Sequence, residues 1–151
     1  MPYKTVFTYN GLCFFPAPKI YLTISQPVLF GAVSEMKCSW HGNLCDDKIV
    51  KWYRRSNGIT EIMWLSNNSR NSPEPGFESK LMLQASTYPE AQCHFHKINL
   101  LNISKDDEEE YFCSVTLDHN FTYSSKETAL RIFGKYHWSI LQILHEGFAL
   151  F

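Results

Sequence analysis

The sequence predicts an all-β fold in which two sheets pack face to face. Short segments of alternating or β-branched apolar residues recur along the chain, and turn signals such as Asn57-Gly58 separate them. Cys38 and Trp52 are followed, much later, by Tyr111 and Cys113 in a Tyr-x-Cys arrangement. Because side chains alternate between the two faces of a strand, Tyr111 and Cys113 point to the same side, toward the predicted core. This order of Cys, Trp and Tyr-x-Cys indicates a β-sandwich.

These residues, together with the stretch Asp107–Cys113 of the form D-x-x-x-Y-x-C, resemble the V-set domains of the immunoglobulin superfamily. The resemblance covers roughly residues 19 to 133 and implies an immunoglobulin-like β-sandwich of V-type, Greek-key topology. We expect this domain at residues 19–135, an irregular N-terminal extension at 1–18 and an apolar C-terminal tail at 136–151. Glu109 and Glu110 stand where the family commonly has small residues, so the chain resembles a divergent member.

The first half of the chain is expected to supply strands A, B, C and C′, at residues 20–24, 32–40, 48–55 and 59–65. Strand A is β-branched and is followed by Pro27, which suits an edge strand. In strand B every second residue, including Cys38, points inward. Strand C places Val50 and Trp52 inward, and Asn57-Gly58 forms the hairpin to strand C′.

The second half begins with a loop at residues 67–77 that is rich in Asn, Ser, Pro and Gly and leaves room for a short C″ strand. Strand D opens at residues 80–83, strand E carries Ile98 and Leu100 inward, and strand F runs from 111 to about 117. Strand G is expected at residues 127–133, where every second residue is Thr, Leu or Ile.

An alternative for strand G is open. Phe133-Gly134-Lys135 resembles the F-G-x-G joining motif of antigen-receptor V domains, which would move strand G to residues 136–144. Tyr136 stands where the second Gly of that motif belongs, so the earlier strand is preferred.

The chain has an odd number of cysteines, so at least one is free or pairs with another chain. The resemblance implies a bridge between Cys38 and Cys113 across the two sheets, with Trp52 packed on it. Cys45 lies in the B–C loop and Cys93 near the D–E loop, and these loops cluster at one end of such a sandwich. We therefore expect a second bridge, Cys45–Cys93; the alternatives are that these two are free, or that Cys13 pairs with one of them.

The turn before strand F is expected to be held by two interactions that the resemblance implies. The Tyr111 hydroxyl should donate to the backbone near Asp107. Lys80, at the start of strand D, should pair with the Asp107 carboxylate, at a position where the family usually has Arg. Both interactions are structural.

Three N-x-[ST] sequons, at Asn67, Asn102 and Asn120, fall in predicted loops or at strand ends, and we expect them to carry N-linked glycans. Together with the predicted bridges, they favour an extracellular location, secreted or on the cell surface in a longer form. Residues 1–18 lack the apolar segment of a signal peptide, and no run of about 18 apolar residues predicts a membrane span. These features favour a soluble, alternatively spliced form of a receptor.

Composition and motifs argue against several other classes of function. The net charge of −1 and pI of 6.6 give no general attraction to nucleic acid or an anionic membrane. No catalytic spacing or phosphate-binding glycine loop occurs, so no enzyme, small-molecule substrate or cofactor is expected. Cys93-His94-Phe95-His96 offers two histidines to a metal, but zinc needs further ligands, so we favour polar histidines on a solvated strand face. Asp106–Glu110 is interpreted as a solvated acidic turn with no calcium site.

The outer face of the G-F-C-C′ sheet is the predicted partner-binding site, because exposed aromatic residues of the kind enriched in interfaces fall there. The expected contact residues from strands C, C′ and F and from the F–G loop are Tyr53, Trp64, Phe112, Thr116, Leu117, Phe121 and Tyr123. The predicted function is that of an extracellular recognition domain of an immune or adhesion receptor that binds a cell-surface protein. The alternative is a V domain that pairs with another immunoglobulin-like chain, as in an antigen-receptor subunit.

Overall fold

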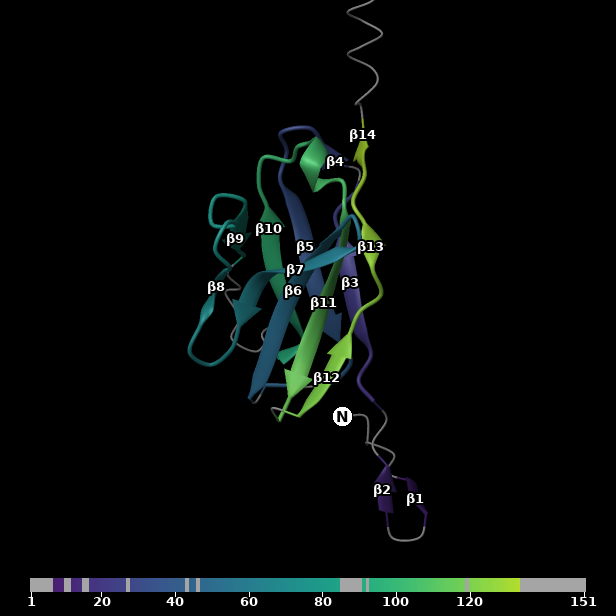
Figure 1. Cartoon of the computed structure of the whole chain (residues 1–151). Coiled ribbons are helices and arrows are strands. Elements are labelled where there is room, and N and C mark those ends of the chain that lie inside the picture. The colour runs from purple at the N-terminus through teal and green to yellow at the C-terminus, as the bar shows by residue number, and fades with distance from the viewer. Residues whose placement is uncertain are drawn as a thin grey trace, which may run out of the picture.

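The computed structural model describes residues 7–9, 12–14, 17–26, 28–42, 44–45, 47–84, 91, 93–118 and 120–133, with side chains from residue 17 onward. It confirms an all-β sandwich in which two antiparallel sheets pack face to face (Figure 1). In the described part of the chain, no helix is long and apolar enough to cross a membrane.

A turn of 3-10 helix, Lys105–Asp107, precedes β11. In chain order the strands are β1 (Phe7–Tyr9), β2 (Leu12–Phe14), β3 (Ile20–Ile24), β4 (Val28–Leu29), β5 (Ser34–Trp40), β6 (Lys48–Ser56), β7 (Ile59–Ser66), β8 (Asn71–Pro73), β9 (Leu81–Leu83), β10 (Phe95–Leu100), β11 (Glu110–Leu117), β12 (Phe121–Ser124), β13 (Thr128–Ala129) and β14 (Ile132–Phe133).

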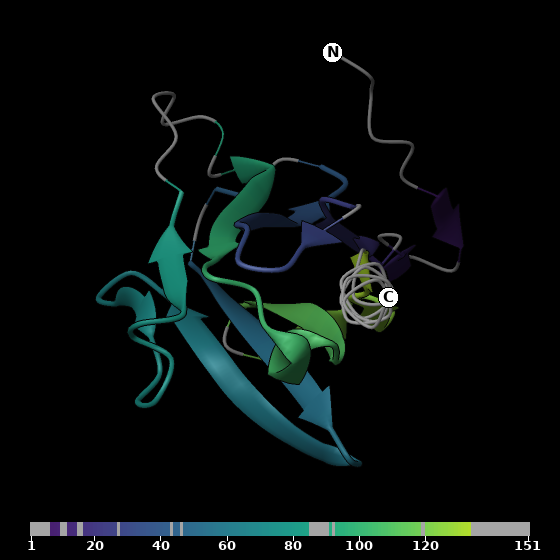
Figure 2. The same ribbon diagram turned by 90° about the horizontal axis from the view of Figure 1, so that it is seen from above.

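The first sheet has the order β3-β5-β10-β9, which corresponds to predicted strands A, B, E and D. The second sheet has the order β12-β11-β6-β7-β8. These strands correspond to predicted strands G, F, C and C′, followed by a short C″ strand. In addition, β13 pairs with β11. Figure 2 shows the two layers from above, with β6 and β7 in one layer and β5 and β10 in the other. A parallel pair, β4 with β14, lies apart from these two sheets.

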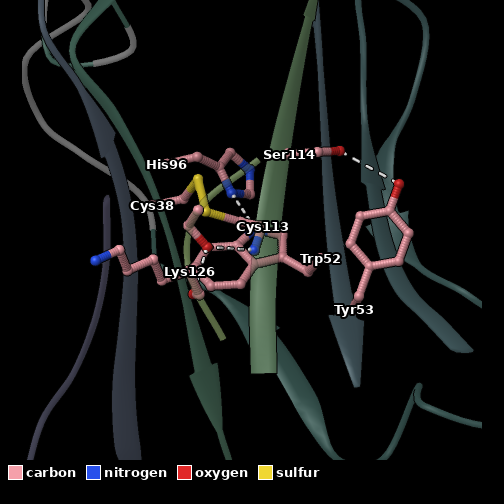
Figure 3. The surroundings of a disulfide bond; sticks show 8 residues. Cys38, Trp52, Tyr53, His96, Cys113, Ser114 and Lys126 are labelled. Atoms are coloured by element: carbon pink, nitrogen blue, oxygen red, sulfur yellow. Dashed lines mark hydrogen bonds between the residues drawn. A yellow bond between two sulfur atoms is a disulfide. The ribbon is translucent and has the colours of Figure 1, made fainter. Parts of the chain in front are cut away.

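The core lies between the sheets, and its residues alternate along the strands as predicted. In β5 the side chains of Ser34, Met36, Cys38 and Trp40 are buried, and those between them are partly exposed. The Cys38–Cys113 bridge joins the two sheets with a Cα–Cα distance of 6.1 Å. Trp52, directly across from Cys113 on β6, is fully buried beside this bridge (Figure 3). The second bridge, Cys45–Cys93, is also confirmed.

The turn that leads into β11 forms as predicted, with Asp107 at its centre. The Asp107 carboxylate accepts hydrogen bonds from the Ser104 backbone N–H at 2.8 Å and from the Lys80 ammonium at 2.7 Å. The Tyr111 hydroxyl donates to the Asp107 carbonyl oxygen at 2.8 Å. Burial, and then the nearby charge of Asp107, raise the pKa of Tyr111 well above its ordinary value. The Tyr111 hydroxyl therefore stays protonated and keeps its hydrogen bond to the Asp107 carbonyl oxygen.

Two parts of the sequence interpretation are corrected at the chain's ends. Residues 7–14, within the extension predicted to be irregular, contain the two-stranded β1-β2 sheet. Strand G starts earlier than predicted, because β12 forms a hairpin with β11, and a tight turn in which Asn120 N–H donates to the Leu117 carbonyl replaces the expected longer F–G loop. The later segment, 127–133, does form strand, in two pieces that pair with different partners. The alternative strand at 136–144 and the tail at 136–151 lie outside the described residues.

Candidate functional site

The outer face of the second sheet carries a stacked pair of aromatic rings at its centre. Tyr53 on β6 and Phe112 on β11 are direct cross-strand neighbours. Their ring centroids lie 4.5 Å apart, with the planes only 8° from parallel. Directly opposed residues of antiparallel strands point to the same side of a sheet, and Cys113 and Trp52 are buried, so this pair faces away from the core.

Three further residues lie on the same side of the sheet as the rings. The guanidinium carbon of Arg55 lies 5.8 Å from the Phe112 ring centroid, in the range of a cation–π contact. Ile62, opposite Tyr53 on β7, is 40% exposed. Thr116 completes the group, with its hydroxyl 2.7 Å from that of Thr122 on β12. We call this set, Tyr53, Arg55, Ile62, Phe112 and Thr116, the aromatic face.

Several contacts within the sheet hold the aromatic face in place. The Ser114 hydroxyl donates to the Tyr53 hydroxyl at 3.3 Å (Figure 3), although Ser114 itself is only 2% exposed. The Arg55 guanidinium forms an ion pair with Glu127, and its Nε donates to the Thr60 hydroxyl at 3.2 Å. The face therefore presents ordered aromatic, aliphatic and cationic groups on a rigid sheet. Such groups suit noncovalent recognition, because side chains that are already ordered lose little conformational entropy when a partner binds.

Trp64, predicted to contact a partner, is instead in the core, where it is 2% exposed. Simple alternation along the strand would place it on the outer face, but a β-bulge shifts the register between β6 and β7, so that Trp52 pairs with Trp64 and Tyr53 with Ile62. Met63 is the extra residue, and it is buried next to Trp64. The indole N–H of Trp64 donates to Asn71 Oδ1 at 2.8 Å.

The three residues expected in the F–G loop also lie elsewhere. Tyr123 pairs with the buried Val115, and Phe121 pairs with Leu117, so both belong to the inward side of the sheet. Leu117 and Tyr123 pack against the core, whereas Phe121 is 61% exposed at the sheet's end. The structure thus places Tyr53, Phe112 and Thr116 on the same outer side of the sheet and the other four predicted contact residues on its inward side.

The two candidate metal-binding histidines have different surroundings. His94 is exposed, and its Nδ1 lies 3.2 Å from the Gly42 carbonyl oxygen. His96 is not on a solvated strand face as expected: its Nδ1 accepts the indole N–H of Trp52 at 3.0 Å, beside the disulfide (Figure 3). Burial, and then the charge of Lys48, lower the pKa of His96 to about 4. The imidazole is therefore neutral at ordinary pH.

The acidic run is built into the turn rather than fully solvated. Asp107 is buried, as described above. Glu108 accepts from the Ile132 backbone N–H at 2.9 Å, and Glu109 from the Ser56 hydroxyl at 2.7 Å. These contacts tie the turn to β14 and to the end of β6. Its carboxylates have a structural role here.

The three sequons lie at turns, as expected. Asn67 is half-buried in the turn between β7 and β8, whereas Asn102 and Asn120 are exposed. Asn102 has a positive φ of 46°, a backbone conformation that Asn tolerates better than most residues.

No family model and no curated protein matches this chain.

Proposed function

We propose that this chain is a V-set immunoglobulin domain of an immune or adhesion receptor that binds a cell-surface protein through the aromatic face. The observation that carries the proposal is the Tyr53–Phe112 stack, which lies on the outward side of an open sheet and has Arg55 beside it. Tyr, Phe and Arg are enriched in protein interfaces, and Tyr and Arg are frequent hot spots. The proposed activity is recognition, with no catalytic step.

An extracellular location is part of the same proposal. Two disulfide bridges, Cys38–Cys113 and Cys45–Cys93, form within the described chain, and disulfides persist mainly in oxidising compartments. The three sequons at turns are also consistent with passage through the secretory pathway, where N-linked glycans are added. The D-x-x-x-Y-x-C stretch and the sheet orders support the V-set assignment.

Phe112→Ala and Tyr53→Ala are each expected to weaken partner binding at least tenfold, because truncating a central aromatic anchor typically costs more than about 1 kcal/mol. The partner is first identified by screening the purified domain against a panel of cell-surface ectodomains, and affinities are then measured by surface plasmon resonance. Met82→Ala is the matched control, since Met82 is 52% exposed on β9 of the other sheet. Equal affinities for the Phe112 and Met82 variants would contradict the proposal.

A second candidate function uses the same surface. A V domain that pairs with another immunoglobulin-like chain would also cover the aromatic face, and the Phe133-Gly134-Lys135 sequence, similar to a joining motif, favours this reading. Sedimentation of the glycosylated protein separates the two. A monomer at micromolar concentration that still binds a panel ectodomain supports recognition of a separate partner, whereas a dimer that Phe112→Ala dissociates supports pairing.

A further inference from the structure

The outer face of the first sheet carries two lysines directly opposite each other. Lys37 on β5 and Lys97 on β10 are cross-strand neighbours. The residues that follow them, Cys38 and Ile98, are buried in the core, so the two lysines point to the outside. Like charges at directly opposed positions of a sheet repel each other and destabilise the pairing. An anion bound at this place would relieve the repulsion.

The ring of Phe95 holds the two ammonium groups in position. Lys37 Nζ lies 4.6 Å from the ring centroid and Lys97 Nζ lies 5.3 Å from it, both within the range of a cation–π contact. Glu35 pairs with Lys97 at 3.2 Å, whereas no carboxylate among the described residues forms an ion pair with Lys37. The two ammonium groups are therefore ordered in the free domain, and only one of them has an ionic partner within the described chain.

A third lysine and two aromatic rings extend this surface along β3. Lys19 is exposed just before β3, four residues from the position that pairs with Lys37. At the rise of a β-strand this separation is roughly 14 Å. Tyr21 lies between the two, is 44% exposed, and has its ring 5.2 Å from that of His41 in an edge-to-face arrangement. We call this set, Lys19, Tyr21, Lys37, Phe95 and Lys97, the lysine face.

The composition of the lysine face determines the kind of anion that it suits. Its charges lie at two places about 14 Å apart with an exposed ring between them, so the matching ligand is extended and alternates anionic groups with apolar surface. A sulfated polysaccharide has both features, because its sugar rings present C–H groups that pack on the negative face of an aromatic ring. An acidic polypeptide fits less well, since its planar carboxylates pair best with the forked guanidinium of Arg, and the lysine face contains no Arg.

We propose that the lysine face binds a sulfated polysaccharide of the cell surface. Sulfate groups pair with Lys37 and Lys97 at one place and with Lys19 at the other, and a sugar ring between them packs on Tyr21. The inference rests on the extracellular location proposed above. The lysine face and the aromatic face belong to different sheets and point away from each other, so one domain can hold a polysaccharide and a protein partner at the same time.

The test uses the full chain, secreted from animal cells with a leader added, and an immobilised heparin oligosaccharide as the probe. Surface plasmon resonance is expected to show binding that weakens as the salt concentration rises, because salt screens exposed ion pairs. Lys37→Gln and Lys19→Gln should each weaken this binding about fivefold, as expected for the loss of one exposed ion pair. Lys19 lies outside the strands, so its variant tests the site without altering the sheet.

The matched control is Lys105→Gln, which removes the same charge from an exposed lysine in the 3-10 turn before β11 and should retain the heparin affinity of the natural chain. Equal losses in the Lys105 and Lys19 variants, or no heparin binding at low salt, would overturn the proposal. Soluble polyglutamate should compete more weakly than soluble heparin, and equal competition would overturn the assignment to a polysaccharide. Phe112→Ala should keep its heparin affinity, so failure here is distinct from failure of the aromatic face.

Discussion

Lys80→Met is expected to lower the free energy of unfolding by about 3–5 kcal/mol, the range typical of removing one member of a buried ion pair. The Asp107 side chain is only 3% exposed, and the Lys80 ammonium is 2.7 Å from its carboxylate. Met keeps much of the aliphatic length of Lys, so the variant loses the charge and the hydrogen bonds that the ammonium donates to the Asp107 carboxylate and to the Leu101 and Asn102 carbonyl oxygens. The carboxylate would then be buried with the Ser104 donors alone. Urea unfolding monitored by tryptophan fluorescence measures the difference.

Two further variants show whether the charge is the cause. Lys80→Arg keeps the positive charge and offers a planar pair of donors, so it should unfold within about 1 kcal/mol of the natural chain. Combining Lys80→Met with Asp107→Asn removes both charges and should restore part of the lost stability, since no uncompensated charge is then buried. A double variant that is less stable than Lys80→Met would contradict this explanation.

The features that could be predicted from the sequence are those that local chemistry determines. Cys38, Trp52 and Cys113 each occupy the inward side of a strand with regular alternation, so their positions follow from the period of two. Asn57-Gly58 takes positive φ values of 50° and 79°, as its hairpin requires. Asp107 and Tyr111 lie within the D-x-x-x-Y-x-C pattern, whereas the pairing of Lys80 with Asp107 was predicted from the family resemblance.

The features that were missed depend on pairing between strands. Nothing in residues 59–66 shows the bulge at Met63, because a bulge reflects the match between β6 and β7 and not the composition of either strand. The same holds for Phe121 and Tyr123, whose side of the sheet depends on a turn shorter than expected. Four of the seven predicted contact residues, Trp64, Leu117, Phe121 and Tyr123, therefore lie on the inward side, while Tyr53, Phe112 and Thr116 lie on the outer side as predicted.

His96 was missed for a third reason: alternation places it on the inward side of β10 with Ile98 and Leu100, but its polar side chain was interpreted as solvent-facing. In the structure its Nδ1 accepts from Trp52, and its Nε2 lies 3.1 Å from Asn71 Oδ1, which also accepts from Trp64. This pattern assigns the proton to Nε2, which donates to Asn71. Two buried indoles are thus connected through one neutral imidazole. Protonation of Nδ1 would place a hydrogen against the Trp52 N–H and break that link.

The free energy of unfolding is therefore expected to fall by up to about 3 kcal/mol through His96 as the pH is lowered from about 6.5 to about 4. The pKa of His96 is lowered from 6.5 to about 4 in the folded state. In this window the unfolded chain binds a proton that the folded chain excludes, so stability decreases with falling pH. Above about pH 6.5 both states are neutral, and His96 contributes no pH dependence.

Urea unfolding at a series of pH values, repeated with His96→Gln and His94→Gln, measures this contribution. Gln has an amide oxygen and an amide N–H to replace both hydrogen bonds of His96, but it does not titrate. Carboxylates also protonate toward pH 4, so the quantity of interest is the difference in slope between variants. With His96→Gln, the pH-dependent change in the free energy of unfolding should be smaller by about 3 kcal/mol, whereas His94→Gln, at an exposed histidine outside the Trp52–His96 hydrogen bond, should retain the His96 contribution. Parallel pH profiles for all three proteins would show that the imidazole is not held neutral in the folded state.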